Sequence, residues 1–234
     1  MRTSIGHAVW MTDQDARIAA EKGITFVRNP GSNLRLRNGS APFCTYKHMG
    51  VPLAIGTDNL GLGDEEDMFA EIRLAGALAR SPFFDSAPPP SSAELFEMAT
   101  EGGARMLGMT DVGKIAIGWK ADFAALSLDA IRGIWMSERI PLLDQIVQRA
   151  KAGHVMMTMV DGRVLYENGT HHTVDVGSTV AQVRDFLDRQ ARNTASEQVL
   201  QLASKVEDFY AAQTRVEELP DHWRPLALDP RRRF

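Results

Sequence analysis

Short apolar runs alternate with helix-forming segments over the first hundred residues, and this alternation limits the fold more than any other feature of the 234-residue chain. Residues 4–9, 24–27 and 51–55 have the length and composition of buried strands. Helical patterns follow or separate them, at residues 12–22, 41–49, 65–80 and from Ser91 or Ser92 onward. A strand–helix repeat of this kind predicts βα units built around a parallel sheet.

Particular residues mark where the predicted helices begin and end. Thr12, with Asp15 three positions later, is a variant of the capping box, and Gly23 is typical of a helix C-terminus. Met68, Ile72, Ala75 and Ala79 recur at helical spacing and predict the apolar stripe of one helix. Residues 29–33 are all turn formers, so we expect a turn there instead of regular structure.

The pattern changes after Gly108, where strands and turns become more frequent. The expected elements are a strand at 123–128, a helix at 141–150, a strand at 154–160 and a strand at 163–166 after the turn Asp161-Gly162. Helical spacing with one buried face returns from residue 175 to about 216, before a proline-containing tail. The chain therefore divides into residues 1–108, a small β layer at 109–170, and a helical tail at 171–234.

Composition excludes several classes of function. A net charge of −4 and a pI near 5.9 argue against nucleic acid as the main partner. No apolar run is long enough to cross a bilayer, so no membrane role is expected. Cys44 is the single cysteine, which rules out an internal disulfide, fits a reducing cytoplasm and predicts a small buried side chain.

Two polar residues follow strands of the predicted parallel sheet. Asp58 comes just after the run at 51–55, and His7 lies near the end of the first strand. Because the carboxyl ends of parallel strands face one side, the two side chains could share a metal or a water and act in acid–base chemistry. The alternatives are that Asp58 caps a helix or closes a turn, and that His7 is a core histidine with one hydrogen bond.

The second strand also ends in polar residues. Asn33 belongs to the expected turn, and it could instead contact a ligand. Arg28 should face the same side as His7 and Asp58, where it could bind an anionic part of a ligand. Pairing with a nearby acid such as Asp64, Glu65 or Glu66 is the alternative, and the residue types alone favour it.

A series of motifs gives the chain a resemblance to a known family. They occur in family order and are Gly6-His7-Ala8-Val9-Trp10, Asn29-Pro30-Gly31-Ser32-Asn33-Leu34, Gly39 with Ala41-Pro42, Gly56-Thr57-Asp58, Asp67-Met68-Phe69 with Glu71 and Arg73-Leu74-Ala75, Ala99-Thr100 with Gly103-Ala104-Arg105, and Gly113-Lys114-Ile115 with Gly118 and Lys120-Ala121-Asp122. Together they resemble the C-terminal half of the amidohydrolase superfamily, in the branch that holds cytosine, guanine and S-adenosylhomocysteine deaminases and triazine chlorohydrolases.

The resemblance implies a fold and a set of roles. The fold would be a partial (β/α)8 TIM-type barrel, its last three strands, with part of a small β-sandwich and the helical tail. Asp58 would be a metal ligand and the base that activates water, and His7 would hydrogen-bond the substrate or intermediate. Asn33 and Arg28 are the candidate substrate contacts, and Glu71 and Arg73 look structural. The cofactor would be a divalent metal, zinc or iron, and the substrate a small heterocycle.

The chain also departs from the family pattern. A catalytic zinc takes about three protein ligands, and no His-x-His pair occurs in this sequence. Arg28 stands where relatives commonly carry histidine. We therefore expect a C-terminal fragment of a metal-dependent amidohydrolase, with little metal binding or turnover by itself. The alternatives are a non-catalytic or complementing subunit and a nucleotide-binding βα domain, although the latter lacks a glycine-rich phosphate loop. The expected macromolecular partner is a second copy of this chain or a complementing chain.

Overall fold

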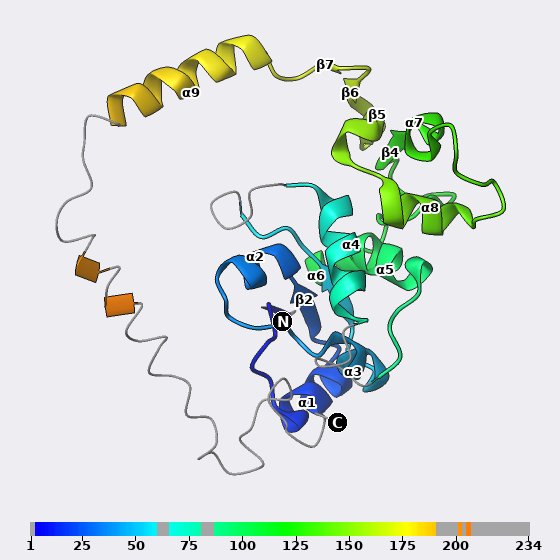
Figure 1. Cartoon of the computed structure of the whole chain (residues 1–234), viewed down its shortest axis with the longest axis vertical. Coiled ribbons are helices and arrows are strands. Elements are labelled where there is room, and N and C mark those ends of the chain that lie inside the picture. The colour runs from blue at the N-terminus through cyan, green and yellow to red at the C-terminus, as the bar shows by residue number, and fades with distance from the viewer. Residues whose placement is uncertain (1–2, 60–65, 81–86, 191–200, 203–204, 207–234) are drawn as a thin grey trace.

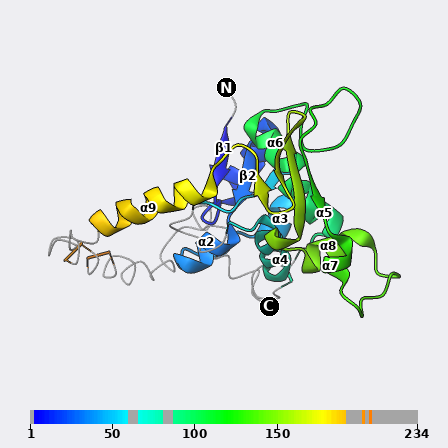
Figure 2. The ribbon, with the colours of Figure 1, turned by 90° about the horizontal axis from the view of Figure 1, so that it is seen from above.

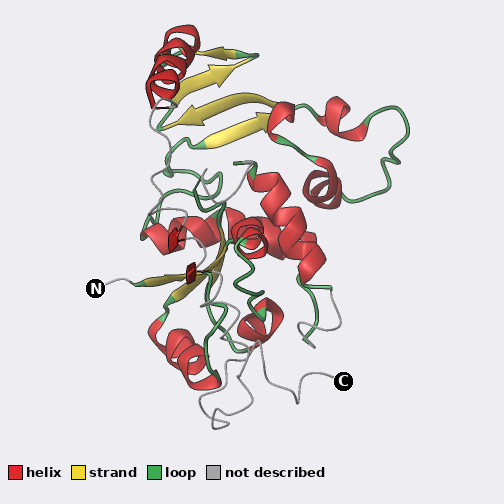
Figure 3. Ribbon diagram, turned by 60° about the vertical axis from the view of Figure 1, so that its left-hand side comes forward, coloured by secondary structure: helices red, strands yellow, loops and turns green. Residues whose placement is uncertain are grey.

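A computed structural model describes residues 3–59, 66–80, 87–190, 201–202 and 205–206 (Figure 1). These residues form a mixed α/β structure with two sheets. One sheet is parallel with the order β1–β2–β3, and the other is antiparallel with the order β4–β5–β6–β7. The alternating first part and the β-rich second part of the sequence thus form separate sheets, which Figure 3 shows one above the other.

The parallel sheet consists of β1 (Ser4–Gly6), β2 (Thr25–Arg28) and β3 (Leu53–Ile55). Gly6 of β1 is in register with Val27 of β2, and Arg28 of β2 is in register with Ile55 of β3. The carboxyl ends of all three strands therefore lie along one edge of the sheet. The residues that follow each strand, including His7 and Asp58, begin from that edge.

Helices connect and cover these strands. They are α1 (Asp13–Lys22), α2 (Pro30–Arg35), α3 (Phe43–His48), α4 (Met68–Leu78), α5 (Ser92–Ala99) and α6 (Glu101–Leu107). The predicted boundaries of α1 are confirmed: Thr12 and Asp15 form the capping box, and Gly23 ends the helix with φ +64°. A left-handed residue is what a glycine accepts without steric cost at this position.

The core lies between the parallel sheet and its helices. Its largest fully buried side chains include Phe26 of β2, Tyr46 of α3, Ile72 of α4 and Leu95 of α5. The stripe predicted on α4 does face this core, because Ile72 and Ala75 are both buried. Cys44 is buried as well, as expected for a small apolar side chain.

The turn predicted at residues 29–33 was wrong, because this segment forms the short helix α2. Pro30 occupies the first turn of α2, where its missing N–H costs nothing and its fixed φ already suits a helix. A contact from another helix adds support, since the backbone N–H of Gly31 donates to the Glu71 carboxylate of α4 over 2.9 Å. Turn-forming residue types therefore start a helix here.

The antiparallel sheet consists of β4 (Phe123–Leu126), β5 (Val155–Val160), β6 (Arg163–Glu167) and β7 (Thr170–His171). The predicted turn between β5 and β6 is confirmed, with positive φ at both Asp161 and Gly162. Short helices α7 (Leu128–Arg132), α8 (Leu142–Arg149) and η1 (Ala152–His154) lie between β4 and β5. Helix α8 packs against α4 and α5, which joins the two parts of the chain.

Helix α9 (Val176–Gln190) begins the tail. Its apolar side chains were expected to be buried, but Val180 is 42% exposed and Phe186 54% exposed. The reason is visible in Figure 2, where α9 extends away from the other described elements instead of packing on them. Most of the helical pattern predicted after residue 190 lies outside the described residues. Within the described residues, no helix has both the length and the apolar character needed to cross a membrane.

Candidate functional site

His7 and Asp58 meet at the carboxyl edge of the parallel sheet, as the positions of their strands predict. Nε2 of His7 lies 3.7 Å from Oδ2 of Asp58, and the two side chains are 35% and 19% exposed. Both residues have left-handed backbones, with φ +63° at His7 and φ +64° at Asp58. Non-glycine residues rarely adopt this conformation, and such outliers cluster at functional sites.

Helix α2 holds both side chains through two successive residues. The hydroxyl of Ser32 donates to Oδ2 of Asp58 over 2.7 Å, and Nδ1 of His7 lies 2.6 Å from Oδ1 of Asn33. An amide oxygen can only accept, so this contact puts the ring hydrogen of neutral His7 on Nδ1. The other nitrogen, Nε2, is then the one that faces Asp58 and could take up or release a proton.

Asp58 does not cap α4, the next helix in the part of the chain that the structure describes. The N-cap of α4 is Asp67, whose side chain accepts from the backbone N–H of Phe69 over 2.9 Å. His7 is not a fully buried core histidine either, because about a third of its side chain is exposed. The structure therefore excludes Asp58 as the cap of α4 and excludes a fully buried position for His7, whereas a turn closed by Asp58 and the catalytic roles of the pair stay predictions.

Glu71 fixes the position of α2. Its side chain accepts from the Gly31 N–H, one residue before Ser32, and Glu71 is only 6% exposed. Burial raises the pKa of this carboxyl, although the Gly31 N–H and the nearby Arg28 guanidinium act in the opposite direction. The structural role that the resemblance implied for Glu71 fits this contact, and an acid one position from the apolar stripe of its helix was the signal in the sequence. Sequence reasoning missed Ser32 as part of the site.

Gly31→Ala should therefore be destabilising. A Cβ at position 31 would lie under 3.0 Å from the Glu71 carboxylate, which would have to move and give up its hydrogen bond to the backbone. We expect a loss of about 1–3 kcal/mol in the free energy of unfolding, measured by urea denaturation. Gly153→Ala is the matched control, because a Cβ there has nothing within 4 Å. Equal stability of the two variants would contradict the role assigned to Glu71.

Arg28 lies in the interior instead of beside His7 and Asp58. It is 2% exposed, and its guanidinium donates to the Ala75 carbonyl over 3.2 Å and to the Ser40 hydroxyl over 3.1 Å. The same group lies 5.2 Å from the centre of the Phe43 ring. We therefore leave Arg28 out of the proposed ligand contacts. Of the acids expected to pair with it, Asp64 and Glu65 lie outside the described residues.

Asn33 was predicted to contact substrate, and the structure gives it a different partner. It is 2% exposed and its amide oxygen faces His7, so its observed role is to orient that ring. Asn29 joins two strand ends in a similar way. With its amide turned to suit its neighbours, the Nδ2 group donates to the carbonyls of Arg28 and Gly56, each over 3.2 Å. The loops that carry the site are thus tied together at their bases.

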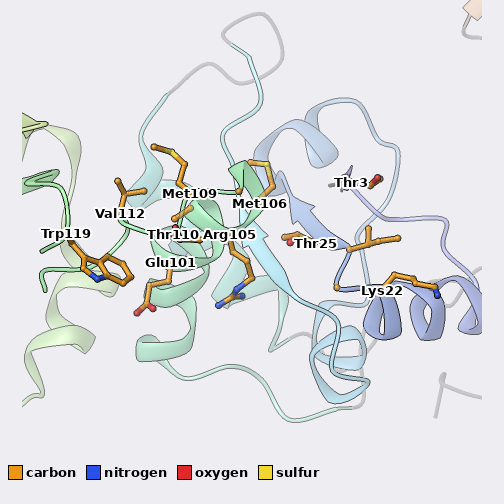
Figure 4. A pocket seen from close by; sticks show the side chains of 14 residues that line it. Thr3, Lys22, Thr25, Glu101, Arg105, Met106, Met109, Thr110, Val112 and Trp119 are labelled. Atoms are coloured by element: carbon orange, nitrogen blue, oxygen red, sulfur yellow. The ribbon is translucent and has the colours of Figure 1, made fainter. Parts of the chain in front are cut away.

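A cavity of about 660 Å³ lies elsewhere, and Figure 4 shows the side chains that line it. Thr3 and Thr25, at the amino ends of β1 and β2, are among them, together with Arg105 and Trp119. The cavity is therefore at the opposite edge of the sheet from His7 and Asp58. Ligands of open α/β sheets bind outside the carboxyl ends of the strands, so this cavity is not favoured as the reaction site.

A metal ion would need more ligands than this edge supplies. His7 and Asp58 provide one imidazole and one carboxylate, whereas a catalytic zinc takes about three protein ligands. In the part of the chain that the structure describes, no group of three or more His, Cys, Asp or Glu side chains could hold a metal ion. The described residues therefore do not fit a catalytic metal by themselves.

Comparison with known proteins gives one family over most of the chain. Residues 1–165 match the model of the Amidohydrolase family. A 5-methylthioadenosine/S-adenosylhomocysteine deaminase of Desulfitobacterium hafniense is 33% identical over 177 residues, which are 76% of this chain and 40% of the relative. The corresponding deaminase of Nitratidesulfovibrio vulgaris is 34% identical over 198 residues, covering 85% of this chain and 43% of the relative.

Solved structures agree with these relatives. An adenosine deaminase of Xanthomonas campestris with bound zinc has a TM-score of 0.73 and 32% identity, over 80% of this chain and 42% of that one. An atrazine chlorohydrolase of Arthrobacter aurescens complexed with zinc has a TM-score of 0.68 and 27% identity, over 78% of this chain and 40% of that one. The chain thus spans about two fifths of the length of the proteins it matches.

Proposed function

Because this chain belongs to the amidohydrolase family, we propose that its His7–Asp58 pair is part of a site for the hydrolytic deamination of a heterocycle. The family membership confirms the resemblance seen in the sequence motifs, and relatives named as deaminases support the reaction class. The observation that carries the proposal is geometric. The imidazole and the carboxylate lie 3.7 Å apart, and successive residues of one short helix hold them in place.

The proposed architecture follows from the same matches. We infer that β1, β2 and β3 are the last three strands of a (β/α)8 barrel, and that β4–β7 form part of a small β-sandwich. Residues 1–108 and 109–170 would then be the two structural units, with residues 171–234 as the tail. Similarity to solved amidohydrolases over about two fifths of their length supports this assignment.

Each residue of the pair has a defined part in the reaction. Asp58 would accept a proton from the attacking water as its oxygen bonds to the ring carbon that carries the amino group. The ring C=N bond opens in this step and its nitrogen takes up a proton. The amino group then takes the proton held by Asp58, the exocyclic carbon–nitrogen bond breaks to release ammonia, and the new hydroxyl gives up the second proton of the water as the carbonyl forms. His7, with its hydrogen on Nδ1 fixed by Asn33, can exchange a proton at Nε2 with the substrate or with Asp58.

A divalent metal, zinc or iron, is proposed for the complete site. Two structural neighbours contain zinc, which supports a metal, and Asp58 is the ligand proposed in this chain. A bound metal of this kind makes water more acidic. The remaining ligands would come from barrel strands other than β1–β3, so the metal site is proposed to need residues beyond those described.

The purified chain is therefore expected to bind divalent metal substoichiometrically and to release little ammonia. Metal content would be measured by elemental analysis after dialysis against zinc or ferrous ion. Turnover would be measured as ammonia release from 5-methylthioadenosine, S-adenosylhomocysteine and 5′-deoxyadenosine, the compounds named for its relatives. One tightly bound zinc per chain together with substrate turnover would show that the metal site needs no residues from outside this chain, and it would contradict this prediction.

A second candidate is a non-catalytic subunit that pairs with a chain supplying other strands. The observation in its favour is that, among the described residues, β1 and β3 each pair with one strand only, namely β2. Open strand edges invite pairing with another chain. Adding the part of a relative that this chain does not match separates the candidates. Complex formation with turnover supports the enzyme, and complex formation without turnover supports the non-catalytic subunit.

A further inference from the structure

The backbone around His7 is strained over two consecutive residues. The N–H of Ala8 donates to the carbonyl of Gly6 over 2.7 Å, which closes a three-residue γ-turn with His7 at its centre. His7 has φ +63° and Ala8 has φ +49°, both in the left-handed region. Neither residue is a glycine, so the turn persists only if surrounding contacts hold it.

Tyr46 supplies one of those contacts from the core. Its hydroxyl donates to the carbonyl of Ala8 over 2.9 Å, and its side chain is completely buried. The ring packs edge-to-face on Phe26, with centroids 5.1 Å apart and an interplanar angle of 83°. Because the Tyr46 ring extends from α3 and packs against β2, its hydroxyl is held in place and anchors the carbonyl of the turn.

Removal of the Tyr46 hydroxyl would affect the site through the peptide bond that joins His7 to Ala8. Ala8 follows His7 directly and is 4% exposed, so its carbonyl would lose its buried partner if the hydroxyl were removed. The turn could then relax toward ordinary backbone angles. Any such rotation would swing the His7 ring away from Asn33 and Asp58, which it now meets at 2.6 Å and 3.7 Å.

We propose that Tyr46 is a positioning residue that keeps His7 in its strained turn, so that Nδ1 reaches Asn33 while Nε2 faces Asp58. The value of this arrangement for chemistry rests on the function proposed above. The positioning of His7 by Tyr46 does not rest on that function, because it concerns only the conformation of His7 in this chain. Its test therefore uses a signal of the histidine ring and needs neither a metal nor turnover.

The test is Tyr46→Phe in the full chain with 15N-labelled histidine. The His7 ring signals are assigned by their disappearance in His7→Gln. In the natural chain, Nδ1 of His7 should carry a hydrogen that exchanges slowly with water. In Tyr46→Phe, that hydrogen should exchange roughly fivefold faster or more, the factor implied by the loss of one net hydrogen bond. His48, which lies on α3 with Tyr46, should be unchanged and reports that the helix is still in place.

A second variant separates positioning from simple loss of stability. Glycine adopts left-handed angles without steric cost, so Tyr46→Phe combined with Ala8→Gly should restore slow exchange at His7. Tyr166→Phe, a change of the same kind on β6, should leave His7 unaffected. A folded Tyr46→Phe chain with unchanged His7 signals would overturn the proposal.

The double variant also decides the case in which Tyr46→Phe fails to fold. A folded double variant with slow exchange supports the proposal, because relief of strain at Ala8 then replaces the tyrosine hydroxyl. A double variant that does not fold, or that folds with fast exchange, overturns it and leaves Tyr46 a core residue only. Absence of deaminase activity has no bearing on these outcomes, so a failure of the proposed function stays distinguishable from a failure of this inference.

Discussion

Gly102→Ala is expected to lower the free energy of unfolding by about 3 kcal/mol, the upper part of the range for overpacked cores. Gly102 is buried on α6, where the helix lies directly against β3. A Cβ at this position would lie under 3.0 Å from the backbone carbonyl oxygen of Leu53 and 3.5 Å from the Cα of Ala54. Those atoms belong to the parallel sheet, so they cannot move aside as the end of a side chain could. The loss would be measured by urea denaturation followed by tryptophan fluorescence and circular dichroism.

The neighbouring glycine provides a matched control. Gly103 is on the same helix, and a Cβ added there has nothing within 4 Å. Gly103→Ala should be neutral or stabilising by up to about 1 kcal/mol, because alanine is the better helix former. If both variants were equally stable, the close approach of α6 to β3 would be refuted. The comparison also bears on the site, since β3 leads directly to Asp58.

Local signals explain what could be predicted of the fold. The boundaries of α1 depend on Thr12, Asp15 and Gly23, which act on backbone groups within one turn of themselves. The cap of α5 works in the same way, because Ser91 and Glu94 form a second capping box. Strand alternation and the turn at Asp161-Gly162 are equally short-range. Such features depend only on residues that are close together in the chain, so they can be predicted from the sequence.

The errors come from contacts between residues far apart in the chain. Helix α2 was expected to be a turn because its residue types favour turns, but its Gly31 is bonded to Glu71, 40 residues away. Arg28 was expected at the site, but its guanidinium reaches Ala75, 47 residues away. No local pattern specifies partners at such distances. The same holds for Tyr46 and Ala8, which are separated by 38 residues.

The candidate site also combines features that local patterns predict with features that depend on contacts between distant residues. That His7 and Asp58 would meet could be predicted, because parallel strands present their carboxyl ends at one edge. The residues that orient them could not, since Ser32 and Asn33 reach the site only because α2 is a helix with both side chains turned to that edge. The resemblance supplied the expected roles of the pair, and those roles await the experiment on Asp58.

Asp58→Asn is expected to reduce turnover by about a thousandfold, within the range for loss of a general base. The measurement uses this chain combined with the part of a relative that it does not match, once that mixture or fusion releases ammonia from an adenosine-like substrate. Asparagine has nearly the shape of aspartate, and its amide oxygen can still accept the hydrogen bond that Ser32 now gives Asp58. The fold should therefore survive, while the group that takes the proton from water is lost.

Asp67→Asn is the control that makes this result specific. Asp67 caps α4 through Oδ1 and lies on the same connection after β3, and asparagine is about as good an N-cap as aspartate. The exposed hydrogen bond that Oδ2 accepts from the Ala152 N–H over 3.0 Å would be lost, which should cost some stability and leave the reacting groups unchanged. The activity of this variant should stay close to that of the unchanged protein. If Asp58→Asn kept activity within about tenfold of that control, a shift of about 1.4 kcal/mol or less in the barrier, Asp58 could not be the base. The 3.7 Å approach of His7 would then have to serve substrate binding alone, and the proton acceptor would lie on another strand.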